Sequence, residues 1–300
     1  MTSTAPQAVA GVIGMGIMGK AYARHLCEAG IEVAGFDVDS AALEALEGWG
    51  GKTCGSPAEV AAAADVLLLA LPSLKALEDV VSGPEGITGA LKRGTVVCEM
   101  STLPVDAKER AAEAVAAAGG TMLDCPVSGT GAQAAVRDLV IYTSGDETAM
   151  EVARPVLETL GREIRHVGSF GAGMKMKYVA NLLVTIHNLA AAEALLMAER
   201  SGLDLQMAFD ALSSGAGTSR MFEVRGPMMI ADEYEPATMK HDVYVKDLQL
   251  IMDHAREIRS PTPLMAAALP FYYAALAEGR DKEDTASLFA VLKGMTQPAG

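Results

Sequence analysis

The first half of the chain alternates between short apolar runs and longer segments with helical spacing. Runs of this length, closed by Gly, Pro or polar residues, are typical of strands buried on both faces of a parallel sheet. They occupy residues 8–13, 31–36, 66–71, 95–100, 121–124, 139–143 and 162–167. Ala-rich stretches with helical spacing, such as residues 105–118, lie between them. The alternation predicts an α/β domain with a doubly wound parallel sheet.

The pattern changes after Gly168. Residues 173–200 are mainly Ala, Leu and other apolar residues with no proline or interior glycine. They indicate one helix of roughly 40 Å at 1.5 Å per residue. Further helices are expected near residues 205–213, 242–256, 263–276 and 282–292, and we see no strand pattern after Val167. The sequence therefore predicts two domains, residues 1–168 with the sheet and residues 169–300 all-α, joined by the long helix.

Residues 14–19 read Gly-Met-Gly-Ile-Met-Gly, between the first apolar run and a helical segment at residues 17–29. In this context a Gly-x-Gly-x-x-Gly run is typical of a dinucleotide-binding turn. Gly14 permits the tight turn, Gly16 lets the backbone approach a pyrophosphate, and Gly19 lets the helix pack close to the strand. The N–H groups at the helix N-terminus then face the phosphates. A glycine-rich turn without a ligand is the alternative.

A carboxylate follows the second apolar run, about 20 residues beyond the glycines. Asp37 at this position would accept hydrogen bonds from the adenosine ribose hydroxyls and repel a 2′-phosphate. The sequence therefore predicts NAD as the cofactor and disfavours NADP. The cofactor-binding residues predicted here are Gly14, Met15, Gly16, Ile17, Met18, Gly19 and Asp37.

Composition narrows the partners and the compartment. The net charge of −14 argues against nucleic acid and against an anionic membrane surface, since both need a basic face. Apolar runs are shorter than about 18 residues or are broken by charge, so no membrane span is expected. No cationic, apolar leader precedes the first strand, which favours a cytoplasmic protein with residues 1–7 as a frayed tail.

Four cysteines, Cys27, Cys54, Cys98 and Cys125, form no Cys-x-x-Cys pair and have no histidines at ligand spacing. Reduced, buried thiols and no metal site are therefore expected. Cys125 lies in the loop of residues 124–131, so for this residue alone a reactive thiol is an alternative to a packing role.

Lys177 and Asn181 are four residues apart on the predicted long helix. They differ by about 40° around its axis, so both can face the same cleft. A lysine on a largely apolar helix can have its pKa lowered by desolvation, and can then exchange a proton with a hydroxyl as a hydride leaves. Asn181 can hold the same oxygen or orient the amine. The alternative is a solvated lysine at the helix start, the role that also suits Lys175 on nearly the opposite side.

Residues 124–131, Asp-Cys-Pro-Val-Ser-Gly-Thr-Gly, follow another predicted strand. Pro126 sets an extended turn. The glycine-flanked segment after it exposes backbone N–H groups and the hydroxyls of Ser128 and Thr130, which suits a small anionic substrate with a carboxylate. A plain surface turn would explain the same composition.

Three of these segments, residues 14–19, 124–129 and 171–181, occur in an order and spacing that resemble the β-hydroxyacid dehydrogenase family. The resemblance covers essentially the whole chain. It implies a Rossmann-type NAD-binding domain in residues 1–168, and an all-α substrate-binding and dimerisation domain in residues 169–300. It also implies a homodimer or homotetramer that transfers a hydride between NAD and a small hydroxy acid, such as 3-hydroxyisobutyrate or a four-carbon sugar acid.

The resemblance also implies roles for single residues. Lys177 would be the general acid and base with Asn181 as its partner, whereas Ser128 and Gly129 would bind the substrate carboxylate. Lys246 would lie beside the nicotinamide and the substrate. The loops implied to line the cofactor contain Leu71, Pro72 and Thr102.

One position departs from the family pattern. Thr130 stands where the family has a second glycine, so its Cβ and hydroxyl either narrow the site or add a donor. Residues 221–225, 245–248 and 282–284 are similar to members that act on four-carbon sugar acids such as threonate. His187 fits that subgroup as well, although a packing role on the helix also explains it.

Two other functions remain possible for this architecture. An NADPH-dependent aldehyde or imine reductase is disfavoured by Asp37, and by Lys177, which imine reductases generally lack. A catalytically silent nucleotide-binding scaffold is disfavoured because Lys177, Asn181, Ser128 and Lys246 are all retained.

Overall fold

The computed structural model describes residues 8–296, and the tail expected at residues 1–7 lies outside them. The chain divides into two compact units, Met1–Lys177 and Tyr178–Gly300. The division falls inside the long helix α8 (Ala172–Arg200), whose first turn is bonded to Asp124 of the first unit. The bounds and roles predicted for the two domains stay predictions at this point.

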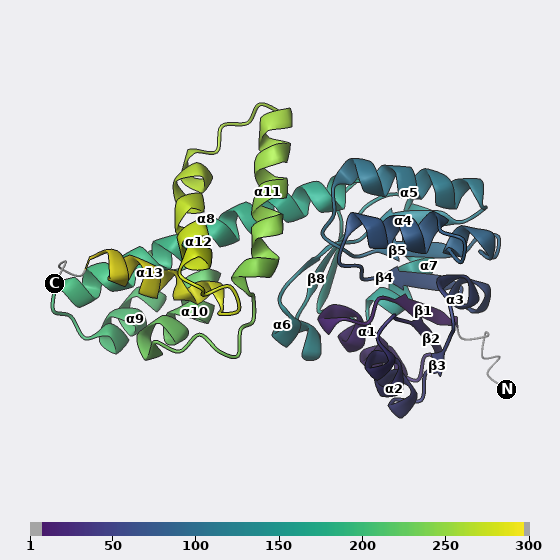
Figure 1. Ribbon diagram of the computed structural model, residues 1–300, viewed down its shortest axis with the longest axis horizontal. Helices are drawn as coiled ribbons and strands as arrows, with labels where there is room; N and C mark the ends of the chain where they lie inside the picture. Colours follow the sequence, from purple (N-terminus) through teal and green to yellow (C-terminus); the bar gives the residue numbers. More distant parts are fainter. Residues whose placement is uncertain (1–7, 297–300) are drawn as a thin grey trace. The chain divides into compact units, whose positions relative to one another are not determined.

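The first unit is built on a six-stranded parallel sheet with the order β3-β2-β1-β4-β5-β6 (Figure 1). The strands are β1 (Ala10–Ile13), β2 (Val33–Phe36), β3 (Lys52–Thr53), β4 (Val66–Leu69), β5 (Val96–Glu99) and β6 (Thr121–Asp124). In the centre, Val12 of β1 pairs with Gly35 of β2 and Leu68 of β4. The predicted doubly wound parallel sheet is confirmed.

Helices cover both faces of this sheet. They are α1 (Ile17–Glu28), α2 (Ser40–Gly48), α3 (Pro57–Ala63), α4 (Leu74–Ser82), α5 (Val105–Ala117) and α7 (Glu147–Leu157), with a short 3-10 helix η1 (Ile87–Gly89). On one face Leu68 packs in a buried cluster with Leu26 of α1 and Val156 of α7. On the other face Leu67 packs with Val115 of α5. Because alternate strand residues enter opposite clusters, the strands are apolar throughout, as parallel strands buried on both faces require.

The sheet series ends earlier than the sequence predicts. The strands β8 (Val140–Thr143) and β9 (Glu163–His166) form a second sheet with β7 (Val127–Ser128), and β7 is antiparallel to β8. Only two residues separate β6 from β7, whereas a parallel return needs a crossover of about a dozen residues. The chain therefore leaves the first sheet after Asp124, and the expectation of one continuous parallel series was wrong here.

In the second unit, helices gather around the C-terminal part of α8 (Figure 1). They are α9 (Leu205–Ser213), α10 (Arg220–Ala231), α11 (His241–Glu257), α12 (Pro263–Ala277) and α13 (Leu288–Met295), with a 3-10 turn η2 (Thr285–Ser287). Thr185 and Asn188 of α8 are buried. The hydroxyl of Tyr272 donates to the carbonyl of Thr185 at 3.1 Å, and the Asn188 amide donates to the carbonyl of Thr285 at 2.7 Å. These bonds tie α8 to α12 and η2.

The sequence missed α10, because Gly226 and Pro227 lie inside it. The structure explains the glycine: a Cβ on Gly226 would lie 2.5 Å from the Phe209 ring, so only glycine lets α9 and α10 pack this closely. The last helical segment was expected from residue 282 and starts at Thr285, where Asp284 caps it by accepting from the Ala286 N–H at 3.0 Å. In the described part of this unit no strand is found.

By length and composition, α8 is apolar enough to cross a membrane, so the expectation that no segment would qualify was wrong on those criteria. One such helix is weak evidence, because the core helix of a soluble protein passes the same test. In α8, 44% of the most apolar window is buried inside the protein.

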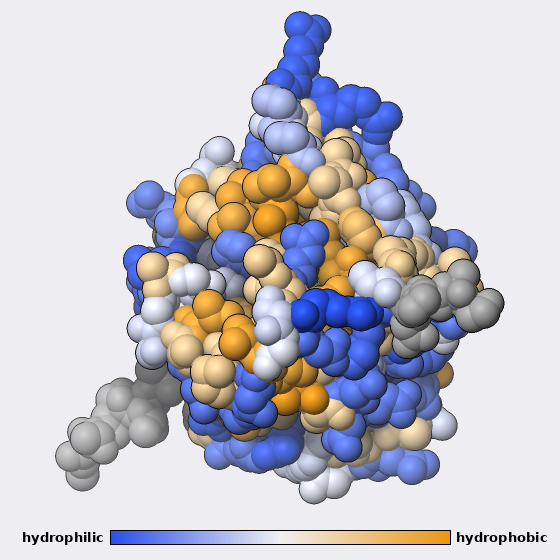
Figure 2. Space-filling view, turned by 90° about the vertical axis from the view of Figure 1, so that its left-hand side faces the viewer, coloured by the Kyte–Doolittle hydropathy of each residue, from blue (hydrophilic) through white to orange (hydrophobic). Residues whose placement is uncertain are grey.

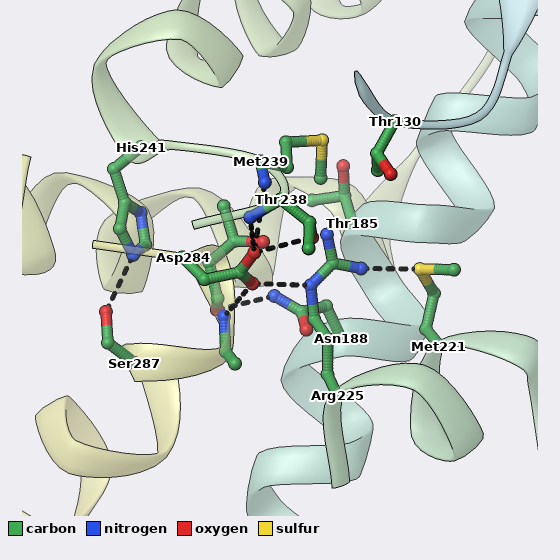
Figure 3. A network of polar contacts seen from close by, with 12 residues as sticks. Thr130, Thr185, Asn188, Met221, Arg225, Thr238, Met239, His241, Asp284 and Ser287 are labelled. Atoms are coloured by element: carbon green, nitrogen blue, oxygen red, sulfur yellow. Dashed lines mark hydrogen bonds and ion pairs between the residues drawn. The ribbon is translucent and has the colours of Figure 1, made fainter. Parts of the chain in front are cut away.

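The second unit contains a buried ion pair between Arg225 and Asp284 (Figure 3). The Arg225 Nε lies 3.0 Å from Asp284 Oδ1, and the two side chains are 2% and 0% exposed. The other carboxylate oxygen of Asp284 accepts from the N–H groups of Thr238 and Met239 at 2.8 and 3.0 Å. His241 lies in the same region with its Nε2 3.0 Å from the hydroxyl of Ser287, and burial lowers its pKa to about 4, so that it is neutral at pH 7.

Candidate active site

The glycine turn has the geometry that the motif predicts. Gly14 has a φ of +85°, and a Cβ there would lie 2.4 Å from the Ala70 carbonyl. A Cβ on Gly19 would lie 1.9 Å from the Gly14 carbonyl, so glycine is needed for α1 to pack against the end of β1. Around Gly16, the N-cap of α1, nothing lies within 4 Å of an added Cβ. This open approach to a helix N-terminus fits a pyrophosphate.

Asp37, directly after β2, is held by two backbone donors. Its Oδ2 accepts a short hydrogen bond from the Met15 N–H, and its Oδ1 accepts from the Asp39 N–H at 2.8 Å. The carboxylate is therefore fixed beside the glycine turn. A ribose diol can reach such a carboxylate, whereas a phosphate there would meet like charge.

A cavity of about 680 Å³ opens beside the glycine turn, at the carboxyl ends of β1 and β2. Its lining includes Gly14, Asp37, Leu71 and Pro72. Three of its lining residues are carboxylates, Asp37, Asp79 and Glu85, and none is lysine or arginine. The size and the mixed apolar and acidic lining suit a nucleoside.

Of the three loop residues implied by the resemblance, two line this cavity and one does not. Leu71 and Pro72 do, and the Leu71 N–H donates to the Ser101 hydroxyl at 2.8 Å, which fixes this loop. Thr102 is not among the cavity residues. Its contact with a cofactor stays a prediction.

The predicted carboxylate loop leads into a short helix that the sequence missed. Ser128 ends β7 and is partly exposed, and Gly129 has a φ of +136°. Thr130 is the N-cap of α6 (Gly131–Ala135), and its N–H donates to the Gln133 side chain at 3.1 Å. Threonine followed three residues later by glutamine is a capping-box signal, and it was available in the sequence.

The loop lies against the glycine turn within the first unit. A Cβ on Gly131 would lie 2.4 Å from Cγ2 of Ile17, the first residue of α1. The His25 Nε2 of α1 also lies 2.8 Å from the Ala134 carbonyl of α6. The structure therefore brings together two motifs that are more than a hundred residues apart in sequence.

At the start of this loop, Asp124 belongs to a buried ionic cluster that the sequence pattern does not predict. The Nζ of Lys108 is 2.7 Å from Glu99 Oε2 and 2.7 Å from Asp124 Oδ1, and none of the three side chains is exposed. Burial alone would lower the pKa of Lys108, but the two carboxylates raise it well above its ordinary value. This lysine is therefore permanently charged and not available as a base near pH 7.

Lys177 lies in the second turn of α8, whose first turn is bonded to Asp124: the Met174 N–H donates to Asp124 Oδ2 at 2.7 Å. Lys177 is partly exposed, whereas Lys175 is exposed. Both belong to the first unit. β1 and β6 are parallel strands of one sheet, so the glycine turn after β1 and Asp124 at the end of β6 lie at the same carboxyl edge, where open α/β sheets bind ligands.

Asn181 and Lys246 belong to the second unit. The Asn181 amide donates to Asp247 Oδ2 at 2.9 Å, and its backbone carbonyl accepts from the Tyr244 hydroxyl at 3.0 Å. Asp247 therefore orients the Asn181 side chain. The sequence pattern assigns no role to Asp247 itself, although residues 245–248, which contain it, are similar to enzymes of four-carbon sugar acids.

All four cysteines are free thiols. Cys54, Cys98 and Cys125 are buried, and Cys27 is partly buried. Burial raises the pKa of Cys125 well above its ordinary value, which leaves an inert thiol and favours packing over the reactive alternative. Within residues 8–296, no group of three or more His, Cys, Asp or Glu side chains could hold a metal ion.

Comparison with known proteins agrees with this arrangement. Residues 9–168 match the family described as the NAD binding domain of 6-phosphogluconate dehydrogenase. Residues 171–292 match the family described as NAD-binding of NADP-dependent 3-hydroxyisobutyrate dehydrogenase.

Individual relatives align over nearly their whole length. The chain is 35% identical to an L-threonate dehydrogenase of Cupriavidus necator, covering 96% of this chain and 97% of the relative. It is 32% identical to a 2-(hydroxymethyl)glutarate dehydrogenase of Eubacterium barkeri, covering 95% of each. A solved 3-hydroxyisobutyrate dehydrogenase from Salmonella typhimurium has 31% identity and a TM-score of 0.84, covering 95% of this chain and 100% of that one. The chain therefore belongs to the β-hydroxyacid dehydrogenase family and is an NAD(P)-dependent hydroxyacid dehydrogenase.

Proposed function

We propose that this enzyme oxidises a small hydroxy acid with Lys177 as its acid–base group and NAD as its preferred cofactor. The observation that carries the proposal is the bond between the Met174 N–H and Asp124, which fixes the start of α8 at the carboxyl edge of the sheet. The glycine turn and the Ser128 loop lie at the same edge, joined by the contact between Ile17 and Gly131. The glycine turn, the loop proposed to bind the substrate carboxylate, and Lys177 thus belong to one unit.

Each residue then has one task. NAD, when bound, supplies the hydride acceptor. Lys177 takes the proton from the hydroxyl oxygen as the hydride leaves the carbon that carries this hydroxyl, and it returns the proton in the reverse direction. Ser128, Gly129 and Thr130 hold the substrate carboxylate through hydroxyl and N–H donors. Asn181, oriented by Asp247, holds the reacting oxygen, and Lys246 adds a positive charge for an anionic substrate.

For the substrate we propose a hydroxy acid of the 3-hydroxyisobutyrate or four-carbon sugar-acid kind. The relatives named for L-threonate and 2-(hydroxymethyl)glutarate support this class. Thr130 has a structural task as the N-cap of α6, which explains a threonine there without any substrate contact. Its side chain still borders the loop, so we retain it as a residue that tunes which acid fits.

The test is the rate of NADH formation from NAD⁺ with a panel of C3 to C6 hydroxy acids. We expect turnover with acids that carry a hydroxyl near the carboxylate, and little with the matching alcohols that lack the carboxylate. Reduction of imines or simple aldehydes with NADPH, without oxidation of any acid, would support the reductase alternative. Nucleotide binding without turnover on any of these compounds would support the scaffold alternative.

The cofactor preference depends on Asp37. An Asp37→Ala variant should lose most of the preference for NAD over NADP in kcat/KM, because the carboxylate that binds the ribose and repels a 2′-phosphate is gone. Asp79→Asn is a matched control, since this carboxylate lines the same cavity but is paired with Lys75 at 2.8 Å. Equal or better wild-type efficiency with NADP would overturn the assignment.

We also propose a cytoplasmic homodimer or homotetramer that binds neither nucleic acid nor membranes. The net charge of −14 supports the absence of polyanionic partners. Apolar groups stand among charged ones on the face in Figure 2, and the exposed apolar side chains of the second unit support self-association. They include Met197, Leu203, Met207, Leu264 and Tyr273.

A further inference from the structure

The proposed reaction does not use the buried cluster of Glu99, Lys108 and Asp124. Two carboxylates and one ammonium group leave a net charge of −1 with no exposed side-chain surface. An uncompensated charge in a protein interior is strongly destabilising. Another partly positive group must therefore face the cluster.

The Ser101 N–H donates to Glu99 Oε1 at 3.1 Å, and the N-terminus of α8 supplies a second such group at Asp124. Asp124 Oδ2 accepts from the Met174 N–H at 2.7 Å, and the Ser144 hydroxyl accepts from the Gly173 N–H at 2.9 Å. These N–H groups belong to the first helical turn and have no partner inside the helix. A helix of 29 residues also has a positive N-terminal dipole end, which attracts a carboxylate. Asp124 is thus a helix cap supplied by a distant segment.

The contact is tight and its position is fixed. A Cβ on Gly173 would lie 2.6 Å from the Tyr142 carbonyl and 3.0 Å from Asp124 Oδ2, so only glycine admits the helix this close. The backbone of Asp124 exchanges two hydrogen bonds with Ser144, at 3.0 and 2.8 Å. These contacts therefore hold the carboxylate against the first turn of α8.

We propose that Asp124, held by Lys108, which also pairs with Glu99, is a positioning residue that sets the place of Lys177 relative to the Ser128 loop. Lys177 follows Met174 by three residues, which is about one helical turn, and Ser128 follows Asp124 by four residues. One buried carboxylate thereby links the lysine to the loop that holds the substrate. This inference rests on the proposed role of Lys177.

Asp124→Asn tests it with little change of shape. Lys108 and the Met174 N–H donate to different oxygens of Asp124, and a carboxamide places an NH2 donor at one of these two positions, so one of the two bonds is lost. We expect kcat to fall 10- to 100-fold, since displacements of about 1 Å in a reacting group cost up to 10²-fold. The KM for the hydroxy acid should change less than kcat, and the affinity for NAD should stay within twofold. Amide hydrogen exchange at residues 173 and 174 should become faster.

Asp146→Asn is the matched control. Asp146 caps α7 in the same unit by accepting from the Ala149 N–H at 2.7 Å, and α7 carries no proposed site residue. This variant should keep its kcat and most of its stability, because asparagine caps a helix about as well as aspartate. If Asp124→Asn does not fold, Ser144→Ala decides, because it leaves the ion pairs intact and removes one acceptor from the helix start. For Ser144→Ala we expect a three- to tenfold fall in kcat.

A double-mutant cycle separates positioning from general stability. If Asp124 acts through Lys177, adding Asp124→Asn to Lys177→Ala should reduce single-turnover rates no further. Losses that multiply in full, or a folded Asp124→Asn variant with wild-type kcat, would overturn the inference. If Lys177→Ala alone keeps its turnover, the proposed function fails, whereas exchange at residues 173 and 174 still reports whether Asp124 holds the helix.

Discussion

Replacing Lys177 by alanine should lower kcat by 10²-fold or more while NAD binding is preserved. Removal of a hydride from a hydroxyl carbon leaves a developing carbonyl, and the hydroxyl proton must leave in the same event. General acid–base catalysis contributes about 10²- to 10⁴-fold, which sets the expected loss. Lys108, a second lysine of the same unit, is paired with two carboxylates and fully buried, so it cannot take over this task.

Two further variants sharpen this prediction. Lys177→Arg should fail as well, because a guanidinium group does not release its proton near neutral pH. Lys175→Ala is the matched control, since this exposed lysine lies two residues earlier on the same helix and should be dispensable. In the wild type, kcat/KM for oxidation should rise with pH through one ionisation that Lys177→Ala lacks. A folded Lys177→Ala variant with near-normal turnover would show that another group moves the proton.

Much of the first unit could be predicted from sequence because its signals are local. Continuous apolar runs mark strands that are buried on both faces. Gly14 and Gly19 meet two separate steric demands, whereas Gly16 leaves the approach to the helix N-terminus open. The residues that could not be predicted depend on contacts between distant segments. Lys108 looks like a solvated residue of an Ala-rich helix, yet it is buried between Glu99 and Asp124. Its burial depends on where β5 and β6 end, which no local pattern records.

In the second unit, two segments that the sequence links to a substrate class contain residues with a structural role. Residues 221–225 and 282–284 were singled out by their similarity to enzymes of four-carbon sugar acids. The structure shows that Arg225 and Asp284, one from each segment, form a buried ion pair. Similar residues in relatives can therefore reflect a shared packing solution as well as a shared substrate. This role could not be inferred from sequence, since 59 positions separate the two residues.

Removing the Asp284 carboxylate should destabilise the second unit by about 3–5 kcal/mol, the usual cost of leaving one member of a buried ion pair alone. In an Asp284→Ala variant the Arg225 guanidinium stays buried, and the N–H groups of Thr238, Met239 and Ala286 lose their acceptor. Denaturant unfolding measures the loss. Arg256→Met is the control, because Arg256 and Asp253 form an exposed pair that should contribute less than about 1 kcal/mol.

The same carboxylate makes a prediction about acid stability. Burial by itself would raise the pKa of Asp284, but the Arg225 charge and the hydrogen bonds hold it below the ordinary value. A carboxylate with a lowered pKa in the folded state stabilises the protein above its unfolded pKa of about 3.9, and this stabilisation is lost as the pH falls further. Asp284→Ala should therefore lose less stability than the wild type on acidification below pH 4.

The double variant Asp284→Ala with Arg225→Met should recover part of the loss at neutral pH, because no unpaired charge remains buried. A single variant as stable as the wild type would mean that the pair orders the segment around Thr238 without stabilising the fold.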